Sequence, residues 1–229
     1  MHHLSIDLET YSSVNIKKAG AQAYMRSPDF EILLLSYSVD GGPVKTIDLT
    51  ETHGIPQDVT AMLRNPAYSK HAYNAAFEWG CLSQYYGEML PPREWRDTML
   101  HALYCGYPAS LEAAGKALGL AEDKQKLSTG KSLIRYFCVP CKPSRVNGNR
   151  TRNLPRHDPE KWRLFKEYNA QDVVTVMEIE AKLSGFPVPD SVQAQWETDL
   201  RINDRGVAVD MEFVKSALHL GVVMNERLM

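Results

Sequence analysis

The sequence predicts an α/β protein, a mixed β-sheet flanked by helices and followed by a helical extension. Three observations predict this class. Strand-like segments come first in the chain and helix-like segments follow them. The later segments have the amphipathic spacing of helices that pack on a sheet. Neither internal repeats nor low-complexity stretches interrupt this order.

The composition is that of an ordinary globular protein. The chain has 229 residues, of which 44% are hydrophobic and 24% charged, with a formal net charge of −2. This charge argues against a general polyanion-binding protein, but it is compatible with a nucleic-acid enzyme that uses metal ions. No apolar run approaches the roughly 18 residues that cross a membrane, and the start does not resemble a signal peptide. We therefore expect no membrane association and a reducing, cytoplasmic location.

The expected strands show alternation, or continuous apolar runs bounded by turn residues. The first, "LSIDLETYS" (4–12), alternates Leu4, Ile6 and Leu8 with polar residues. The second, "EILLLSYSVDGG" (31–42), is heavily apolar and ends in a turn. The remaining strand segments are 43–49, 68–75 and the short beginning of 94–106.

Helices are expected where a capping or breaking residue bounds a helical periodicity. The helix over 158–183 is long, and Asp158 is its expected cap. Asp97 is interpreted in the same way, as the cap of the helix that continues the segment 94–106. A loop over 138–158 precedes the long helix, and "GFPVP" (185–189) ends it. The other expected helices span 56–65, 76–87, 110–120, 126–137, 190–204 and 210–229.

Acidic residues stand where a core-facing pattern would prefer apolar ones. Asp7 and Glu9 lie two residues apart on the first strand, so both carboxylates project from the same face. On the long helix, Asp172 interrupts an apolar stripe, and Tyr168 lies one turn before it. A buried carboxylate is costly unless it is paired or holds a metal. Glu78 stands at the start of another helix. The stripe consists of Phe165, Tyr168, Asp172, Val176, Ile179 and Leu183.

Each of these residues also has an ordinary structural interpretation. Asp7 and Glu9 could form an exposed edge pair, and Asp172 could be satisfied by an arginine or a helix N-terminus. Glu78 could be a first-turn acid favoured by the helix dipole, and Tyr168 could simply pack in the core. Taken one by one, the residues leave these alternatives open. Taken together, they indicate a site.

The cysteines offer a second possible site. Four are present, and Cys138 and Cys141 form a C-x2-C pair. A zinc site would need two more ligands, and His157 is the only histidine close downstream. Reduced thiols are therefore favoured, with a structural zinc as the alternative.

Three motifs in this chain resemble those of the DnaQ-like 3′–5′ exonuclease superfamily, in its tyrosine-containing branch. They are "IDLET", "HAYNAAFE" and "YNAQDV", in that order. The matching residues are Asp7 and Glu9, then Asn74, Phe77 and Glu78, then Tyr168 and Asp172. The resemblance covers roughly residues 1–184 and implies a ribonuclease H-like fold. One departure is Glu78, where the superfamily usually has Asp, and this puts the geometry of a second metal in question.

The resemblance implies hydrolysis of a 3′-terminal phosphodiester with two divalent cations, Mg²⁺ or its substitute Mn²⁺. Hard cations prefer oxygen ligands, which explains a carboxylate cluster without His or Cys. Asp7 would bridge both ions, Glu9 and Asp172 would complete the water-activating site, and Glu78 would help to hold the second ion. Tyr168 would orient the water, because an ordinary phenol with a pKa of about 10 stays protonated.

The implied substrate is the single-stranded 3′ end of DNA, bound without sequence preference. Main-chain groups of Leu8 and Thr10 would meet the terminal nucleotide. Asn74 would brace the second motif or contact the substrate, and Phe77 would also be a substrate contact.

Stacking and phosphate contacts are expected from other side chains. Tyr11, Phe77 and Trp79 are the stacking candidates, with core packing the favoured role for Phe77. The basic loop "KPSRVNGNRTRNLPRH" (142–157) is the candidate for phosphate contacts, and a solvated mobile loop is its alternative.

A second resemblance lies in the tail. "WETDLRINDRGVAVDMEFVKSAL" (196–218) is similar to the segment that joins the proofreading and polymerase domains of family-A DNA polymerases, especially phage ones. We therefore expect an exonuclease domain over 1–184 and a helical linker over 185–229, leading to a polymerase domain of the same parent chain. The implied location is the cytoplasm of a bacterium or a phage-infected host. The alternatives are an RNA-trimming exonuclease of the same superfamily and a catalytically weak DNA-binding domain.

Overall fold

The computed structural model describes residues 1–120 and 130–228 and contains a five-stranded sheet in the order β3-β2-β1-β4-β5. The strands are β1 (His2–Tyr11), β2 (Glu31–Val39), β3 (Lys45–Asp48), β4 (Tyr68–Ala72) and β5 (Trp95–Asp97). The pairs β1–β2 and β2–β3 are antiparallel, whereas β1–β4 and β4–β5 are parallel. The predicted mixed sheet is therefore confirmed, with β1 at its centre.

The long expected helices are present, and three short ones were missed. The helices are α1 (Ile16–Ala19), α2 (Ala21–Met25), α3 (Leu49–Thr52), α4 (Gln57–Arg64), α5 (Ala75–Tyr86), α6 (Thr98–Tyr104), α7 (Leu111–Ala117), α8 (Gly130–Phe137), α9 (Pro159–Leu183), α10 (Asp190–Arg205) and α11 (Met211–Leu228). Within the described residues, the 3-10 turns η1 (Pro92–Glu94) and η3 (Pro155–His157) complete the set. The missed helices α1, α2 and α3 are too short to show a periodicity. Of the expected helix over 126–137, residues 126–129 lie outside the described part.

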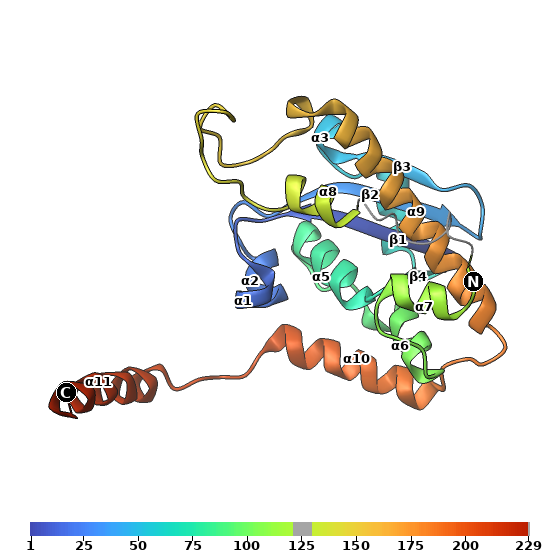
Figure 1. Ribbon diagram of the computed structural model, residues 1–229. Coiled ribbons are helices and arrows are strands. Elements are labelled where there is room, and N and C mark those ends of the chain that lie inside the picture. The colour runs from blue at the N-terminus through green and yellow to red at the C-terminus, as the bar shows by residue number, and fades with distance from the viewer. Residues whose placement is uncertain (121–129, 229) are drawn as a thin grey trace.

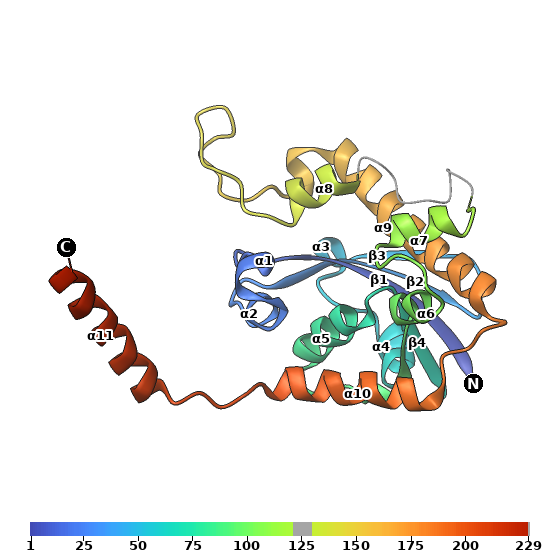
Figure 2. The same ribbon diagram turned by 60° about the horizontal axis from the view of Figure 1, so that its bottom comes forward.

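Helices cover both faces of the sheet. Figures 1 and 2 show α8 and α9 over one face, and α5 on the other with α10 below it. The alternation of β1 explains the two layers, because Leu4, Ile6 and Leu8 enter the core cluster that contains Trp79 of α5. Tyr11 faces the other way, into a cluster with residues of α8 and α9. Asp7 and Glu9 share the parity of Tyr11 and so face α9.

The long helix α9 is the principal cover of that face. All six residues of the predicted stripe are buried, Asp172 and Tyr168 among them. Asp158 accepts a hydrogen bond from the backbone N–H of Lys161 at 3.0 Å, which confirms it as the cap. Since α9 crosses β1 and β2, polar residues on its inner face meet the polar face of β1.

The two last helices differ in their packing. Leu200 of α10 is buried in the core cluster, and the Gln193 side chain donates to the carbonyl of Trp95 at 3.0 Å. By contrast, α11 has no buried residue and stands away from the body in Figures 1 and 2. Within residues 1–120 and 130–228, no helix has the length and apolarity needed to cross a membrane.

Candidate active site

Two neutral side chains hold the acids of β1. The Asn169 amide on α9 donates from Nδ2 to Oδ2 of Asp7 at 2.5 Å. The Cys138 thiol, directly after α8, donates to Oε2 of Glu9 at 3.8 Å. Asp7 is half-buried and Glu9 is buried. The first two predicted site residues therefore lie under the helical cover, which excludes the exposed edge pair.

A tight turn places Glu78 in the first turn of α5. Asn74, between β4 and α5, adopts a left-handed conformation with φ of 65°. Its backbone N–H donates to Oδ1 of Asp97 at 2.9 Å, and the same oxygen caps α6 by accepting from Met99. The interpretation of Asp97 as a helix cap is confirmed, and this cap also fixes the turn that starts α5.

The carboxylate of Glu78 is buried close to those of β1. Its Oε2 has no hydrogen-bond partner in the described part of the chain. Burial raises the pKa of Glu78 well above its ordinary value, and the charges of Asp7, Asp97 and Glu9 raise it further. The like charges act on one another because β1 and α5 bring them into one neighbourhood.

The third predicted motif lies on α9, against the same face. Tyr168 and Asp172 are both buried, and Asn169 lies between them in sequence while contacting Asp7. Asp172 follows Asn169 by one helical turn, so it lies beside the same part of β1. The Tyr168 ring packs directly on Gly130, where an added Cβ would come within 2.1 Å of Cε2 of the tyrosine.

Three residues around these acids were missed by the sequence analysis. Asn169 had a usable signal, since it is a polar residue adjoining the buried stripe of a helix. Gly130 and Cys138 had none, because only the packing of α8 on α9 and β1 brings them to the site.

The sequence of this chain is similar to part of a phage DNA polymerase. The chain is 48% identical, over 218 residues, to the DNA polymerase of Bacillus phage SP02. The match covers 95% of this chain and 33% of the polymerase, so the chain spans about a third of its relative. The chain is a homologue of a phage DNA polymerase. No family model matches it.

The fold of this chain is shared with two solved nucleases. Escherichia coli RNase D, an exoribonuclease involved in structured RNA processing, matches with a TM-score of 0.51 and 14% identity, over 90% of this chain and 46% of RNase D. Brucella melitensis NrnC with bound Mg²⁺ matches with a TM-score of 0.52 and 16% identity, over 87% of this chain and 80% of NrnC. The predicted resemblance to a phage DNA polymerase and the predicted fold class are confirmed.

The predicted acids provide the type of ligand atom that a hard divalent cation prefers. They supply carboxylate oxygens alone, and the unpartnered Oε2 of Glu78 is a buried oxygen that a cation would satisfy. Over the described residues, no three His, Cys, Asp or Glu side chains form a ready-made metal cluster. The four predicted carboxylates therefore do not form a preformed cluster within that part of the chain, although Asp7 and Glu9 lie close enough to Glu78 to raise its pKa.

The surroundings of Cys138 and Cys141, the pair considered as a zinc site, are described by the structure. All four cysteines are free thiols, and Cys138 is buried against Glu9. Cys141 donates to the carbonyl of Arg150 at 3.3 Å. Within residues 1–120 and 130–228, no three His, Cys, Asp or Glu side chains are placed to share a metal ion, at this pair or elsewhere.

The predicted substrate residues are divided between core and surface. Leu8 is buried in the core, and the Thr10 hydroxyl pairs with that of Tyr24 at 2.9 Å, so only their main chains remain for a nucleotide. Asn74 is exposed. Phe77 is half-buried and packs against the core, as favoured.

Two stacking candidates are wrong. Trp79 is only 2% exposed, and its indole N–H donates to the carbonyl of Leu90 at 2.8 Å. Tyr11 is 5% exposed, and the Arg152 guanidinium lies over its ring at 3.7 Å. The sequence could not distinguish these core aromatics from exposed ones, because the covering residues come from distant segments.

The basic loop is folded on itself and on the sheet. Arg150 donates to Oδ1 of Asn153 at 2.7 Å, and Arg152 pairs with Glu31 at 2.5 Å. Lys142, Arg145 and Arg156 remain exposed. Only these three basic side chains of the loop are free of such contacts and available to a phosphate.

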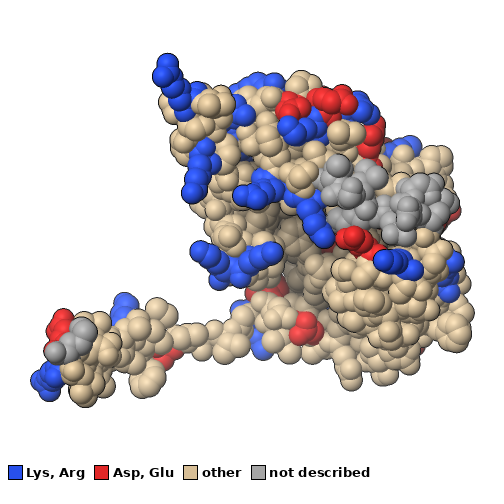
Figure 3. Space-filling view, viewed as in Figure 1, with Lys and Arg blue, Asp and Glu red and all other residues tan. Residues whose placement is uncertain are grey.

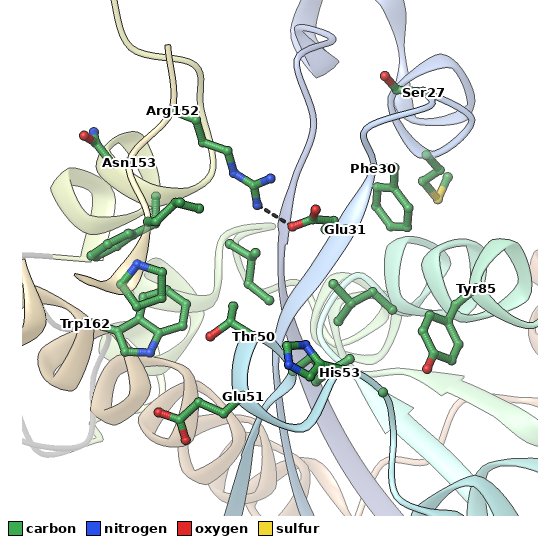
Figure 4. A pocket seen from close by; sticks show the side chains of 18 of the residues that line it. Ser27, Phe30, Glu31, Thr50, Glu51, His53, Tyr85, Arg152, Asn153 and Trp162 are labelled. Atoms are coloured by element: carbon green, nitrogen blue, oxygen red, sulfur yellow. Dashed lines mark hydrogen bonds and ion pairs between the residues drawn. The ribbon is translucent and has the colours of Figure 1, made fainter. Parts of the chain in front are cut away.

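A pocket of about 990 Å³ is lined by residues at the start of β2, by α3 and by the end of the basic loop (Figure 4). Figure 4 shows Arg152 and Glu31 paired at its rim, with Trp162 and Tyr85 on opposite sides. None of the four predicted metal-binding carboxylates lines it. This pocket is therefore separate from the acids of β1, α5 and α9.

Proposed function

We propose that this chain is a metal-dependent 3′–5′ exodeoxyribonuclease, the proofreading part of a family-A, phage-type DNA polymerase. In this proposal, residues 1–184 form the nuclease domain and 185–229 lead toward the polymerase domain. The observation that supports it most is the gathering of buried carboxylates from three separate elements, β1, α5 and α9. Repulsion between buried carboxylates destabilises a folded protein unless a bound cation neutralises it.

The proposed ligands of two divalent cations are Asp7, Glu9, Glu78 and Asp172. When bound, such ions supply an activated water and stabilise charge on the leaving oxygen. The chain's own contribution is to hold four carboxylates in a partly enclosed site. Glu78, with one more methylene than Asp, reaches further from α5 and is the ligand whose position is least fixed by its backbone.

Tyr168 is the proposed orienting group for the attacking water. Its ring is buried between α8 and α9, so the direction of its hydroxyl is set by packing. A protonated phenol can donate one hydrogen bond and accept another. Held one turn from Asp172, the hydroxyl would align water and leave proton acceptance to a carboxylate.

The surface around the site supports a nucleic-acid substrate. In Figure 3, basic side chains gather on both sides of a hollowed part of this face, over the loop that follows α8 and over α1. The α1 side provides the exposed Lys17 and Lys18, and the loop provides Lys142 and Arg145. A single strand lying between them would have its backbone phosphates near cations on both sides.

DNA is favoured over RNA as the substrate. The polymerase relative shares 48% identity with this chain, whereas the exoribonuclease shares 14% and so shows a common fold alone. A 5′-labelled single-stranded oligonucleotide, as DNA and as RNA of the same sequence, tests this choice. With Mg²⁺ or Mn²⁺ we expect stepwise shortening of the DNA from its 3′ end, faster than that of the RNA.

Matched variants separate chemistry from folding in this assay. Asp7→Ala should stop shortening, whereas Asp58→Ala, which removes an exposed acid on α4, should leave the rate unchanged. Faster RNA cleavage would favour the RNA-trimming alternative. Oligonucleotide binding without shortening, in either metal, would favour the catalytically weak DNA-binding domain.

A further inference from the structure

The two acids of β1 are held by neutral donors from two different elements. Asn169 of α9 donates to Asp7 at 2.5 Å, and Cys138 after α8 donates to Glu9 at 3.8 Å. Asn169 is fully buried and Cys138 is 6% exposed. The Cys138–Glu9 contact is therefore buried and the Asn169–Asp7 contact is partly buried, so packing restricts both donor side chains.

The orientation of the Asn169 amide follows from the chemistry of its partner. An ionised carboxylate can only accept hydrogen bonds, so the NH₂ group must face Asp7. The amide oxygen Oδ1 is consequently turned elsewhere, and it is buried without a hydrogen-bond partner in the described part of the chain. An apolar residue would avoid this unsatisfied oxygen. The amide at this position is therefore explained by its contact with Asp7 and not by stability.

Neutral donors suit a site that must bind cations. An arginine or lysine in the same places would fix the carboxylates but would also neutralise them and compete with a metal. An amide or a thiol fixes one oxygen and leaves the full negative charge.

We propose that Asn169 and Cys138 are positioning residues that orient Asp7 and Glu9 for divalent cations. This inference rests on the proposed function of the carboxylates. Asn169 has the larger effect, because its contact is shorter and an amide is a stronger donor than a thiol. Neither residue touches the substrate or the metal in this role.

Direct cation binding is the measurement that tests this role. Free Mn²⁺ is titrated by electron paramagnetic resonance in the full chain, without nucleic acid, and thermal unfolding of each variant is followed in parallel. Asn169→Leu keeps the branched shape and removes the donor, and Asn169→Ala is the smaller replacement if the bulkier leucine prevents folding. We expect either to weaken Mn²⁺ binding by about tenfold to a hundredfold, as losses of supporting residues do at metal sites. Cys138→Ala should weaken it by a few fold, and Cys138→Ser, which restores a donor, should recover it.

A second buried asparagine provides the control. Asn153 is 7% exposed and its amide donates to the carbonyl of Tyr136 at 3.0 Å, away from the carboxylates. Asn153→Ala should lower the unfolding temperature without changing Mn²⁺ affinity. Unchanged or tighter Mn²⁺ binding in the folded Asn169 variants, with binding lost in Asp7→Ala, overturns the positioning role alone. If the wild type binds no Mn²⁺ and also leaves the oligonucleotide uncut in the cleavage assay, the proposed function itself is overturned.

Discussion

Two glutamates that face the protein interior, the buried Glu78 and the half-buried Glu180, have opposite surroundings. Glu78, in the first turn of α5, has an unpartnered Oε2, and burial together with Asp7, Asp97 and Glu9 raises its pKa. Glu180, near the end of α9, accepts hydrogen bonds from His71 at 2.9 Å and Thr98 at 2.6 Å. Burial acts to raise the pKa of Glu180, but these partners hold it below its ordinary value.

The region around Glu180 shows how this fold compensates buried charge. Close by in the sheet, the fully buried ammonium group of Lys70 pairs with Glu94 at 2.6 Å. Glu94 and Glu180 thus have Lys70 and His71 as partners, whereas no described residue forms a hydrogen bond with Oε2 of Glu78. We infer that Glu180 serves stability, whereas Glu78 is retained at a cost to stability because a cation uses it.

The largest expected effect is the difference in exonuclease rate between Glu78→Gln and Glu180→Gln. Glu78→Gln should lower the exonuclease rate by about a hundredfold or more, since even supporting residues at metal sites typically contribute ten- to hundredfold. Glu180→Gln should leave the rate within about twofold, because Glu180 lies outside the carboxylate group. Single-turnover shortening of a labelled oligonucleotide with saturating Mg²⁺ measures both. Equal losses of exonuclease rate in the two variants would contradict the different roles assigned to Glu78 and Glu180.

The next effect concerns the shape of the site. Gly130→Ala would place a Cβ within 2.1 Å of the Tyr168 ring, so the ring or α8 must move. We expect a stability loss of about 1–3 kcal/mol from overpacking and a rate loss of about tenfold from the displaced hydroxyl. Gly221→Ala on α11 is the matched control, since nothing lies within 4 Å of its added Cβ. A normal rate in a folded Gly130→Ala protein would show that Tyr168 needs no fixed orientation.

The acids and the tyrosine were predictable from the sequence because their signals are local. The alternation around Asp7 and the stripe around Asp172 each follow from the geometry of one element. Cys138, which contacts Glu9, and Gly130, which contacts Tyr168, were not predictable, because they reach the site only through the docking of α8. The errors at Trp79 and Tyr11 have the same origin, since the atoms that cover both rings come from distant segments.

The pH dependence of stability should have opposite signs at the two glutamates. Because the pKa of Glu78 is raised in the folded state, its protonation stabilises the fold fully at pH values below the ordinary pKa of 4.5. This contribution is lost as pH rises through the folded-state pKa. The lowered pKa of Glu180 means a contribution that is present above its ordinary value of 4.5 and lost as pH falls through the lowered value. With metal removed by a chelator, the unfolding temperature of Glu78→Gln should exceed that of the wild type increasingly as pH rises. The deficit of Glu180→Gln should shrink on acidification. Parallel pH profiles for both variants and the wild type would contradict the assignment.

The smallest effect tests the compensation of Glu180 itself. Thr98 is 1% exposed, and its hydroxyl donates to the carboxylate oxygen of Glu180 that His71 also contacts. Thr98→Val keeps the shape and removes that donor, so we expect a loss of about 1–2 kcal/mol in the free energy of unfolding at pH 7. The same substitution in a Glu180→Gln background should cost less, because part of its effect depends on the charged acceptor. The exonuclease rate should not change in either background. A full-sized loss in both backgrounds would mean that Thr98 stabilises α6 independently of Glu180, and the carboxylate would then owe its lowered pKa to His71.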